Sequence, residues 1–200
     1  MPQRILIVDD NMSLRSTLSI ILSTLGYEIR SAVDGFSALN EIRQWLPDVL
    51  LSDLNMPGMS GFELLSVVRR RFPQVLVIAM SGAFSEDAVP PNVPADGFYR
   101  KGTGVESLLR MLGGLEDVIR SPARQSEAPI WVSRHTINPC GDGHVVISCP
   151  ECLRVFPQPV PDSGFSSAEV RCVHCAGVVR FALVQAAMET DLTGIFAAVS

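Results

Sequence analysis

Short apolar runs alternate with segments of helical spacing through residues 1–120. The apolar runs are predicted strands at 4–10, 27–32, 48–53, 75–82 and 97–101. Between them, apolar side chains recur every three or four residues, which predicts helices over 13–26, 36–46, 61–72 and 105–119. Strands that are apolar on both faces need cover on both faces, and this favours a parallel sheet between two layers of helices. Residues 1–120 are therefore predicted to form a doubly wound α/β domain with a five-stranded parallel sheet.

One helix of this alternating pattern is interrupted. The segment between the fourth and fifth predicted strands contains Pro90, Pro91 and Pro94. Proline removes a backbone donor and clashes with the preceding turn, so a full-length helix cannot pass through this segment. We expect the helix here to be short or absent.

Two β-rich runs characterise the rest of the chain. Residues 144–156 and 169–184 are apolar, and each contains a Cys-x-x-Cys pair near its middle. This pattern predicts two hairpins that fold at their cysteines. Residues 121–134 are predicted to be a linker that becomes ordered near Trp131, and residues 135–200 a small second domain.

Composition places the chain among globular proteins, with 47% hydrophobic and 18% charged residues over a length of 200. Its apolar runs are shorter than the roughly 18 residues that span a bilayer. The opening residues lack the apolar core of a signal peptide, so we expect a cytoplasmic location. The formal net charge is -5, which does not favour a polyanionic partner.

Polar side chains stand where four of the predicted strands end. Asp9 and Asp10 follow the first strand, Asp53 ends the third, Ser81 lies at the end of the fourth, and Lys101 ends the fifth. In an open parallel sheet, ligands bind beyond the carboxyl ends of the strands. Lys101 is the only lysine among the 16 basic residues of the chain. Because lysine is a compact point charge, it suits a pocket for one small, dense anion.

Three carboxylates in one cleft repel one another, and a bound Mg²⁺ would relieve this repulsion. Beside the metal ion, Asp53 could act as a nucleophile toward phosphorus, while Lys101 neutralises phosphoryl charge and Ser81 donates a hydrogen bond. Simpler structural roles exist: Asp9 and Asp10 could cap a helix, Asp53 could cap a turn, and Ser81 could be an ordinary loop residue. Their joint placement at four strand ends favours the phosphate site.

At these motifs, residues 1–120 resemble the receiver domain of two-component response regulators. The matching stretches are "ILIVDDN", "DVLLSDLNMPGMSGFELL", "AMSG" and "GFYRKG". The resemblance implies a flavodoxin-like fold, with Asp53 as phosphoacceptor and Lys101 in contact with the phosphoryl group. It also implies the following ligands and switch residues: Asp9, Asp10, Asp53 and the carbonyl of Asn55 for Mg²⁺, and Ser81 and Phe98 for the switch.

The sequence departs from the family pattern in two places. The family usually has proline after the lysine, but here the residue is Gly102, so we expect a freer loop. The proline-interrupted helix lies in the face that receivers commonly use for dimerisation and output. The second departure therefore concerns the mode of assembly and leaves the phosphorylation chemistry in place.

Four cysteines of the second half have the spacing of a metal site. Cys149-x₂-Cys152 and Cys172-x₂-Cys175 are separated by 19 residues. Four thiolates on two turns suit a tetrahedral Zn²⁺, and the module resembles a zinc ribbon, in which the ion supplies folding energy. Redox dithiols are the alternative. Three further possibilities stay open: His174 as a substitute ligand, a second cluster of Cys140, His135 and His144, or a free cysteine with two surface histidines.

These features predict a signalling switch without a further enzymatic activity of its own. A sensor histidine kinase or a phosphotransfer protein would phosphorylate Asp53, and the zinc module would relay the change to an unidentified protein partner. A DNA-binding transcriptional regulator is the alternative. It is less favoured, because backbone phosphates are bound mainly by Lys and Arg, and residues 121–200 contain no lysine.

Overall fold

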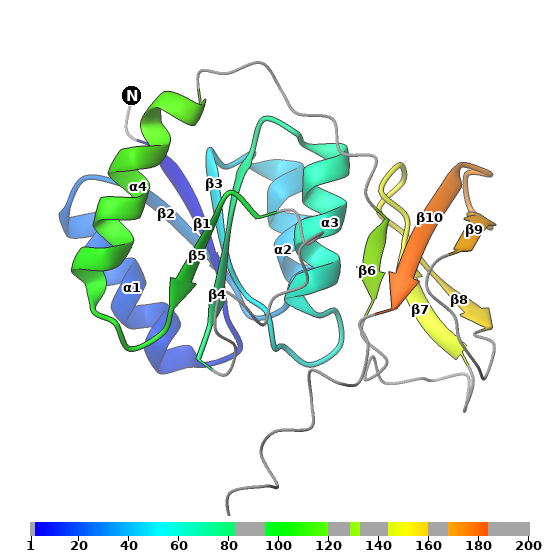
Figure 1. Cartoon of the computed structure of the whole chain (residues 1–200), viewed down its shortest axis with the longest axis horizontal. Helices are drawn as coiled ribbons and strands as arrows, with labels where there is room; N and C mark the ends of the chain where they lie inside the picture. Colours follow the sequence, from blue (N-terminus) through cyan, green and yellow to red (C-terminus); the bar gives the residue numbers. More distant parts are fainter. Residues whose placement is uncertain (1–2, 83–94, 120–128, 133–143, 160–167, 184–200) are drawn as a thin grey trace, which may run out of the picture.

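The computed structural model describes residues 3–82, 95–119, 129–132, 144–159 and 168–183 (Figure 1). Five parallel strands form the main sheet in the order β2-β1-β3-β4-β5. This arrangement confirms the predicted flavodoxin-like sheet. The strands are β1 (Arg4–Val8), β2 (Glu28–Ala32), β3 (Val49–Asp53), β4 (Leu76–Ser81) and β5 (Gly97–Arg100).

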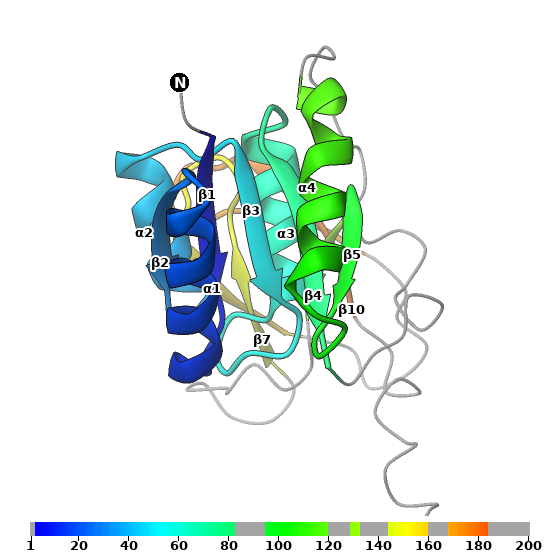
Figure 2. The same ribbon diagram turned by 90° about the vertical axis from the view of Figure 1, so that its left-hand side faces the viewer.

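Helices cover both faces of this sheet. Helices α1 and α4 lie on one face and α2 and α3 on the other, as Figure 2 shows. The expected location of the interrupted fourth helix, residues 83–94, lies outside the described residues. The four described helices are α1 (Met12–Thr24), α2 (Gly35–Gln44), α3 (Gly61–Arg71) and α4 (Val105–Ile119).

The strand side chains divide between two cores. Ile5 and Ile7 of β1 pack with α1 and α4, whereas Leu6 and Val8 pack with α2 and α3. This division follows from the twofold alternation of side chains along a strand. It explains why the apolar run of β1 is continuous, since both of its faces are buried.

Gly61 allows α3 to start very close to β3. A Cβ atom at this position would lie 1.9 Å from the carbonyl oxygen of Asp53 and 2.7 Å from Cα of Leu54. The Gly61 N–H donates to the carbonyl of Leu54 at 3.0 Å. The first turn of α3 is therefore in direct contact with the backbone at the end of β3.

We expect Gly61→Ala to lower the free energy of unfolding by about 3 kcal/mol, because the new methyl group meets backbone atoms that cannot rotate away. Urea unfolding of the purified chain measures this loss. Gly114→Ala is the matched control, since nothing lies within 4 Å of its added Cβ. There alanine should stabilise the helix by about 0.5–1 kcal/mol. Equal stability of Gly61→Ala and wild type would contradict the close contact.

Five short strands form two further sheets beyond α4. Strands β7 and β8 form one antiparallel hairpin, and β9 and β10 form another, which confirms the two hairpins predicted at the cysteine pairs. The order expected near Trp131 is present as β6, which pairs in parallel with β10. The bounds are β6 (Ile130–Val132), β7 (His144–Ser148), β8 (Val155–Pro159), β9 (Ala168–Arg171) and β10 (Val178–Leu183). We call these five strands, together with the Cys-x-x-Cys turns, the cysteine module.

The cysteine module lies against α3, on the side away from the sheet (Figure 1). The Trp131 N–H donates to Oγ of Ser66 at 3.2 Å, and the Ser148 N–H donates to Oε1 of Glu63 at 2.8 Å. Apolar residues of the module join the same core as those of α2 and α3. Helix α3 is therefore covered on two sides, and every residue from Gly61 to Arg69 is buried.

Burial raises the pKa of Glu63 to about 7, although the hydrogen bonds from Ser148 act in the opposite direction. The folded chain thus holds this proton at pH values where the unfolded chain, with a pKa of 4.5, has released it. The contribution of Glu63 to stability is therefore fully present below the unfolded pKa and is lost as the pH rises through about 7.

We expect the free energy of unfolding of the wild type to fall, relative to that of Glu63→Gln, by about 3 kcal/mol between pH 4.5 and pH 8. Glutamine keeps an oxygen acceptor for the Ser148 N–H but carries no titratable proton. Denaturant unfolding of both proteins across this range measures the difference. Parallel stability curves would show that the pKa of Glu63 is not raised in the folded chain.

Candidate functional site

The carboxyl ends of the strands bring the predicted acidic residues together. The carboxylates of Asp9, Asp10 and Asp53 lie within 4.8 Å of one another. Asp9 and Asp53 are buried, whereas Asp10 is exposed. Asp9 follows β1, and Asp53 is the last residue of β3, so neighbouring strands position both side chains at one edge.

Lys101 reaches into this acidic cluster from the end of β5. Its Nζ lies 2.8 Å from Oδ2 of Asp9 and 2.9 Å from Oδ2 of Asp53. Burial alone would lower the pKa of Lys101, but the two carboxylates outweigh it and raise this pKa. The solitary lysine of the sequence therefore stays protonated and bridges two buried acids.

The surroundings of Asp53 disfavour the charged form of its carboxyl group. Burial raises its pKa, and the neighbouring Asp9 charge acts in the same direction. Lys101 and the backbone N–H of Asn55 lower the pKa but do not cancel the effect of burial. A further cation beside Asp53 would favour its charged, nucleophilic form.

The acidic cluster is held in place by backbone contacts. The Asn11 N–H donates to Oδ1 of Asp9 at 2.9 Å, and Nη1 of Arg15 donates to the carbonyl of Asp9 at 2.6 Å. The second oxygen of Asp9 faces Lys101. This cluster offers hard oxygen ligands that are largely preorganised, and hard oxygen ligands are the donor type that Mg²⁺ prefers.

The second cluster consists of the four sulfur atoms of the cysteine module. The Sγ atoms of Cys149, Cys152, Cys172 and Cys175 lie within 4.8 Å of one another. Cys149 Sγ is 3.7 Å from Cys175 Sγ, and Cys152 Sγ is 3.7 Å from Cys172 Sγ, and all four thiols are free. A compact set of four sulfurs fits a tetrahedral zinc ion.

The two Cys-x-x-Cys turns have the same backbone geometry. Leu153 and Ala176, which directly follow the second cysteine of each pair, have φ angles of 56° and 59°. The Leu153 N–H donates to the carbonyl of Cys149 at 2.8 Å, and the Ala176 N–H donates to that of Cys172 at 2.9 Å. Left-handed backbone at non-glycine residues is unfavourable, so two matching instances indicate turns shaped for a common purpose.

Within the two turns, the thiols of Cys149 and Cys172 also have different pKa values. Burial raises the pKa of Cys149 to about 12. Burial acts in the same direction on Cys172, but the N–H groups of His174 and Cys175 outweigh it and lower the pKa of Cys172 to about 7. Four neighbouring thiolates need a cation to coexist, and a metal ion at the centre of the cluster would deprotonate the remaining thiols.

A family model described as "Response regulator receiver domain" matches residues 5–112, which is more than half of the chain. This chain belongs to the response regulator receiver family. The match runs from β1 into the first half of α4, and the acidic cluster and Lys101 lie within it.

The receiver resembles several characterised proteins. The protein-glutamate methylesterase/protein-glutamine glutaminase 3 of Vibrio cholerae is 38% identical over 81 residues, which are 39% of this chain and 23% of that protein. The DNA-binding response regulator MtrA of Mycobacterium tuberculosis is 34% identical over 127 residues, which are 64% of this chain and 47% of that protein. The chain thus spans less than half the length of these curated relatives.

Solved receivers share the fold. The chemotaxis protein CheY4 of Vibrio cholerae has a TM-score of 0.54 and 32% identity, covering 57% of this chain and 98% of its own. The response regulator TrrA of Thermotoga maritima, solved with Mg²⁺-BeF, has a TM-score of 0.53 and 30% identity, covering 56% of this chain and 98% of its own. These structures account for the receiver and leave the rest of the chain uncovered.

The other predicted receiver residues, Ser81, Phe98 and Asn55, have different surroundings. Ser81 is buried at the end of β4, and its carbonyl accepts the Lys101 N–H at 2.8 Å. Phe98 of β5 is half-buried and packs against the core shared by α2 and α3. Asn55 is exposed, two residues after Asp53.

The backbone conformation at Gly102 explains why this chain lacks the proline that receivers usually have at this position. Its φ angle is +89°, whereas the proline ring fixes φ near −65°. The backbone after Lys101 therefore takes a conformation that proline cannot adopt. Two residues later, Gly104 has a φ of +87°, so the loop into α4 relies on glycine twice.

The two possible extra ligands that the structure describes, His174 and His144, do not join the sulfur cluster. His174 is exposed, and its Nε2 lies 3.0 Å from the carbonyl of Val155. His144 starts β7 and belongs to no group of three or more metal-ligand side chains among the described residues. Cys140 and His135 lie outside the described residues.

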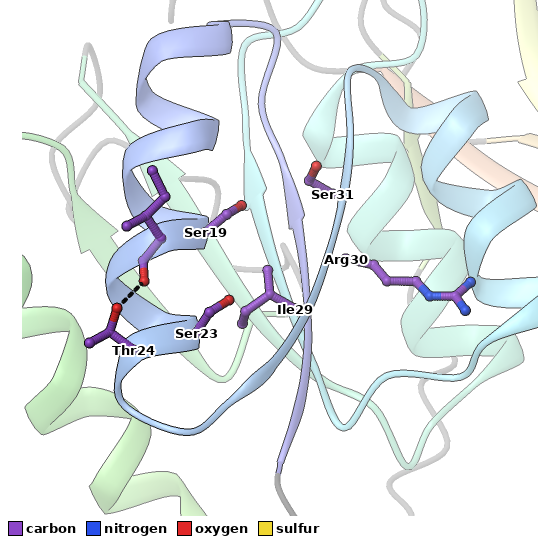
Figure 3. A pocket seen from close by; sticks show the side chains of 7 residues that line it. Ser19, Ser23, Thr24, Ile29, Arg30 and Ser31 are labelled. Carbon is purple, nitrogen blue, oxygen red and sulfur yellow. Dashed lines mark hydrogen bonds between the residues drawn. The ribbon is translucent and has the colours of Figure 1, made fainter.

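A groove of about 460 Å³ lies between α1 and the edge strand β2 (Figure 3). Its lining is rich in hydroxyl groups from Ser19, Ser23, Thr24 and Ser31. Thr24 and Ser19 already donate to the helix carbonyls of Ile20 and Arg15. No residue of the acidic cluster lines this groove, so it is separate from the receiver site.

Sequence reasoning missed Glu63 and Ser66 as contact residues between the receiver and the cysteine module. A signal was present, because the segment FELLSVV from Phe62 to Val68 leaves little polar surface for a helix that faces water. No helix of the described chain is long and apolar enough to cross a membrane.

Proposed function

We propose that this chain is a two-component response regulator that accepts a phosphoryl group on Asp53. The observation that carries the proposal is the position of Lys101 Nζ, within 2.9 Å of carboxylate oxygens on both Asp9 and Asp53. A protonated lysine held beside a buried carboxylate is poised to contact an anion attached to that carboxylate.

The reaction is a transfer of a phosphoryl group to an oxygen of Asp53. This oxygen attacks phosphorus, the bond from phosphorus to the leaving group breaks, and the leaving group departs with the bonding electrons. Lys101 then exchanges its contact with Asp53 for a contact with a phosphoryl oxygen. Ser81 would donate a hydrogen bond to another phosphoryl oxygen, and Phe98 would respond to the change in the position of Ser81.

Asp9, Asp10, Asp53 and the carbonyl of Asn55 would hold Mg²⁺. When bound, this ion supplies positive charge that offsets the developing negative charge of the phosphoryl oxygens. The fit rests on the spacing of the three carboxylates, within 4.8 Å of one another, and on the raised pKa of Asp53. A sensor histidine kinase or a phosphotransfer protein is the proposed donor, in the cytoplasm.

A direct test uses a small phosphodonor in place of the unknown kinase. The purified chain, incubated with acetyl phosphate, should gain the mass of a single phosphoryl group when Mg²⁺ is present and none when EDTA removes the metal ion. Labelling that is independent of divalent cations would contradict the proposed site.

The cysteine module is proposed to be a zinc-ribbon-like output element for a protein partner. Its support is the compact set of four free sulfurs on two matching turns. No enzymatic activity is proposed beyond the receiver's assistance to its own phosphorylation and dephosphorylation. Affinity capture with and without acetyl phosphate should recover a partner whose retention depends on Asp53.

A DNA-binding regulator is the second candidate, because MtrA is a DNA-binding response regulator. The described module carries three exposed arginines, and Arg180 is already paired with Glu169 at 2.6 Å. Duplex DNA binding that weakens steeply as salt rises would favour this candidate. Absence of retention at low salt would remove it.

A further inference from the structure

The two clusters are connected by a short series of contacts through the first turn of α3. At the receiver end, Gly61 touches the backbone of Asp53 and donates to the carbonyl of Leu54. Ser60 caps the helix, and its Oγ accepts the Glu63 N–H at 3.4 Å. The end of β3 at Asp53 and the first turn of α3 therefore form a single packed unit.

At the module end, the same turn contacts the residue next to a cysteine ligand. Oε1 of the buried Glu63 accepts the N–H of Ser148 at 2.8 Å. Ser148 ends β7 and directly precedes Cys149. The side chain of Ser148 also contacts Sδ of Met59, at 4.0 Å, in the loop before α3. Both contacts are buried, so a movement of this turn would leave polar groups without partners.

A second contact between α3 and the module involves strand β6 and not the turn at Cys149. Oγ of Ser66 accepts the N–H of Trp131 in β6, and β6 pairs with β10 at Phe181 to Leu183. These residues lie beyond the Cys-x-x-Cys turn at Cys172. The Ser66 contact thus holds the module against α3 without touching the residue beside Cys149.

From these contacts, and resting on the proposed function, we propose that the hydrogen bond between Glu63 and Ser148 couples the acceptor site to the cysteine cluster. The surface of α3 that carries Glu63 is the docking site of the chain's own module. A phosphoryl group on Asp53 and a metal ion on the four sulfurs then influence each other's affinity through this turn.

The direction of the coupling follows from the arrangement that the structure shows. Lys101 bridges Asp9 and Asp53, and the first turn of α3 packs against the backbone of Asp53 and Leu54 closely enough to exclude a Cβ at Gly61. A phosphoryl group must displace Lys101 from Asp53, which disturbs the turn and the Ser148 contact. Metal affinity at the cysteines should therefore fall when the acceptor is occupied.

The test measures zinc affinity of the full chain by competition with a chromophoric chelator. The measurement is made with Mg²⁺ alone and with Mg²⁺ plus beryllofluoride, which stands in for the phosphoryl group. We expect beryllofluoride to weaken zinc binding about fivefold or more, which is the lower end of typical coupling between two sites. By reciprocity, zinc should weaken beryllofluoride binding by the same factor.

Three variants test whether the effect of beryllofluoride on zinc affinity depends on the Glu63 hydrogen bond or on the general packing of the module against α3. Glu63→Met is similar in size but has no oxygen acceptor. In this variant beryllofluoride should change zinc affinity by less than about twofold, which is below typical coupling. Glu63→Gln keeps an acceptor oxygen and should retain the effect. Ser66→Ala removes the contact to β6 and should also retain it.

Two kinds of failure are distinguishable. If wild type binds zinc and beryllofluoride but its zinc affinity is unchanged, or if Glu63→Met shows the full effect, the coupling is wrong and the proposed function stands. A chain that binds zinc but no beryllofluoride overturns both. The wild-type comparison needs no variant, so it decides the coupling even if Glu63→Met fails to fold.

Discussion

Replacement of Asp53 by asparagine should reduce phosphorylation by acetyl phosphate to below detection. The amide is a poor nucleophile and lacks the negative charge that draws Mg²⁺ and Lys101 to this position. Asp9 is not expected to take over, because its side chain is fully buried, whereas that of Asp53 is 7% exposed. Intact-mass spectrometry after incubation with acetyl phosphate and Mg²⁺ measures the loss.

Asp48→Asn is the matched control for this experiment. Asp48 precedes β3 at the opposite edge of the sheet from Asp53, and its Oδ2 accepts the N–H of Arg4 at 2.8 Å. This variant should be labelled like the wild type. Asp53→Asn should remain folded, since burial already raises the pKa of Asp53 and a neutral side chain is easier to bury there. Labelling of the folded Asp53→Asn protein would refute the proposed acceptor.

The sheet and its acidic edge were predictable because their signals are local. A strand such as β1 or β3 is apolar on both faces, and such a run specifies its own burial. The strand ends then fix where Asp9, Asp53 and Lys101 lie, since parallel strands align their carboxyl ends. Hydropathy does not encode the bridging position of Lys101 between two acids, because it depends on side-chain geometry across three strands.

The partner of the contact surface on α3 was not predictable for a different reason. Ser148 lies 85 residues from Glu63 in the sequence, and Trp131 lies 65 residues from Ser66. No local pattern identifies a partner over such a distance. The apolar segment Phe62–Val68 indicates that α3 is covered, but it does not identify what Glu63 and Ser66 contact. The hairpins themselves were predictable, because each cysteine pair interrupts its own apolar run.

Loss of metal from the cysteine module is expected to have the largest effect on stability. Cys172→Ser should reduce bound zinc from one ion per chain to none and lower the free energy of unfolding of the module by about 4 kcal/mol or more. That value is the stabilisation given by a ligand at a thousand times its dissociation constant. Short hairpins with a small core depend on the ion for folding energy.

Undocking of the module would then expose the apolar face of α3. Trp131, half-buried in β6 and hydrogen-bonded to Ser66, reports this step by fluorescence once Trp45 is replaced by phenylalanine. Elemental analysis measures the zinc, and chelation of the Trp45→Phe protein with EDTA should reproduce the fluorescence change. Cys140→Ser in the same background, which alters the one cysteine outside the two Cys-x-x-Cys pairs, should keep the zinc and the unchanged spectrum. A zinc affinity of folded Cys172→Ser equal to that of the wild type would exclude the four-sulfur site, because removing a thiolate ligand must weaken a tetrahedral site built from four.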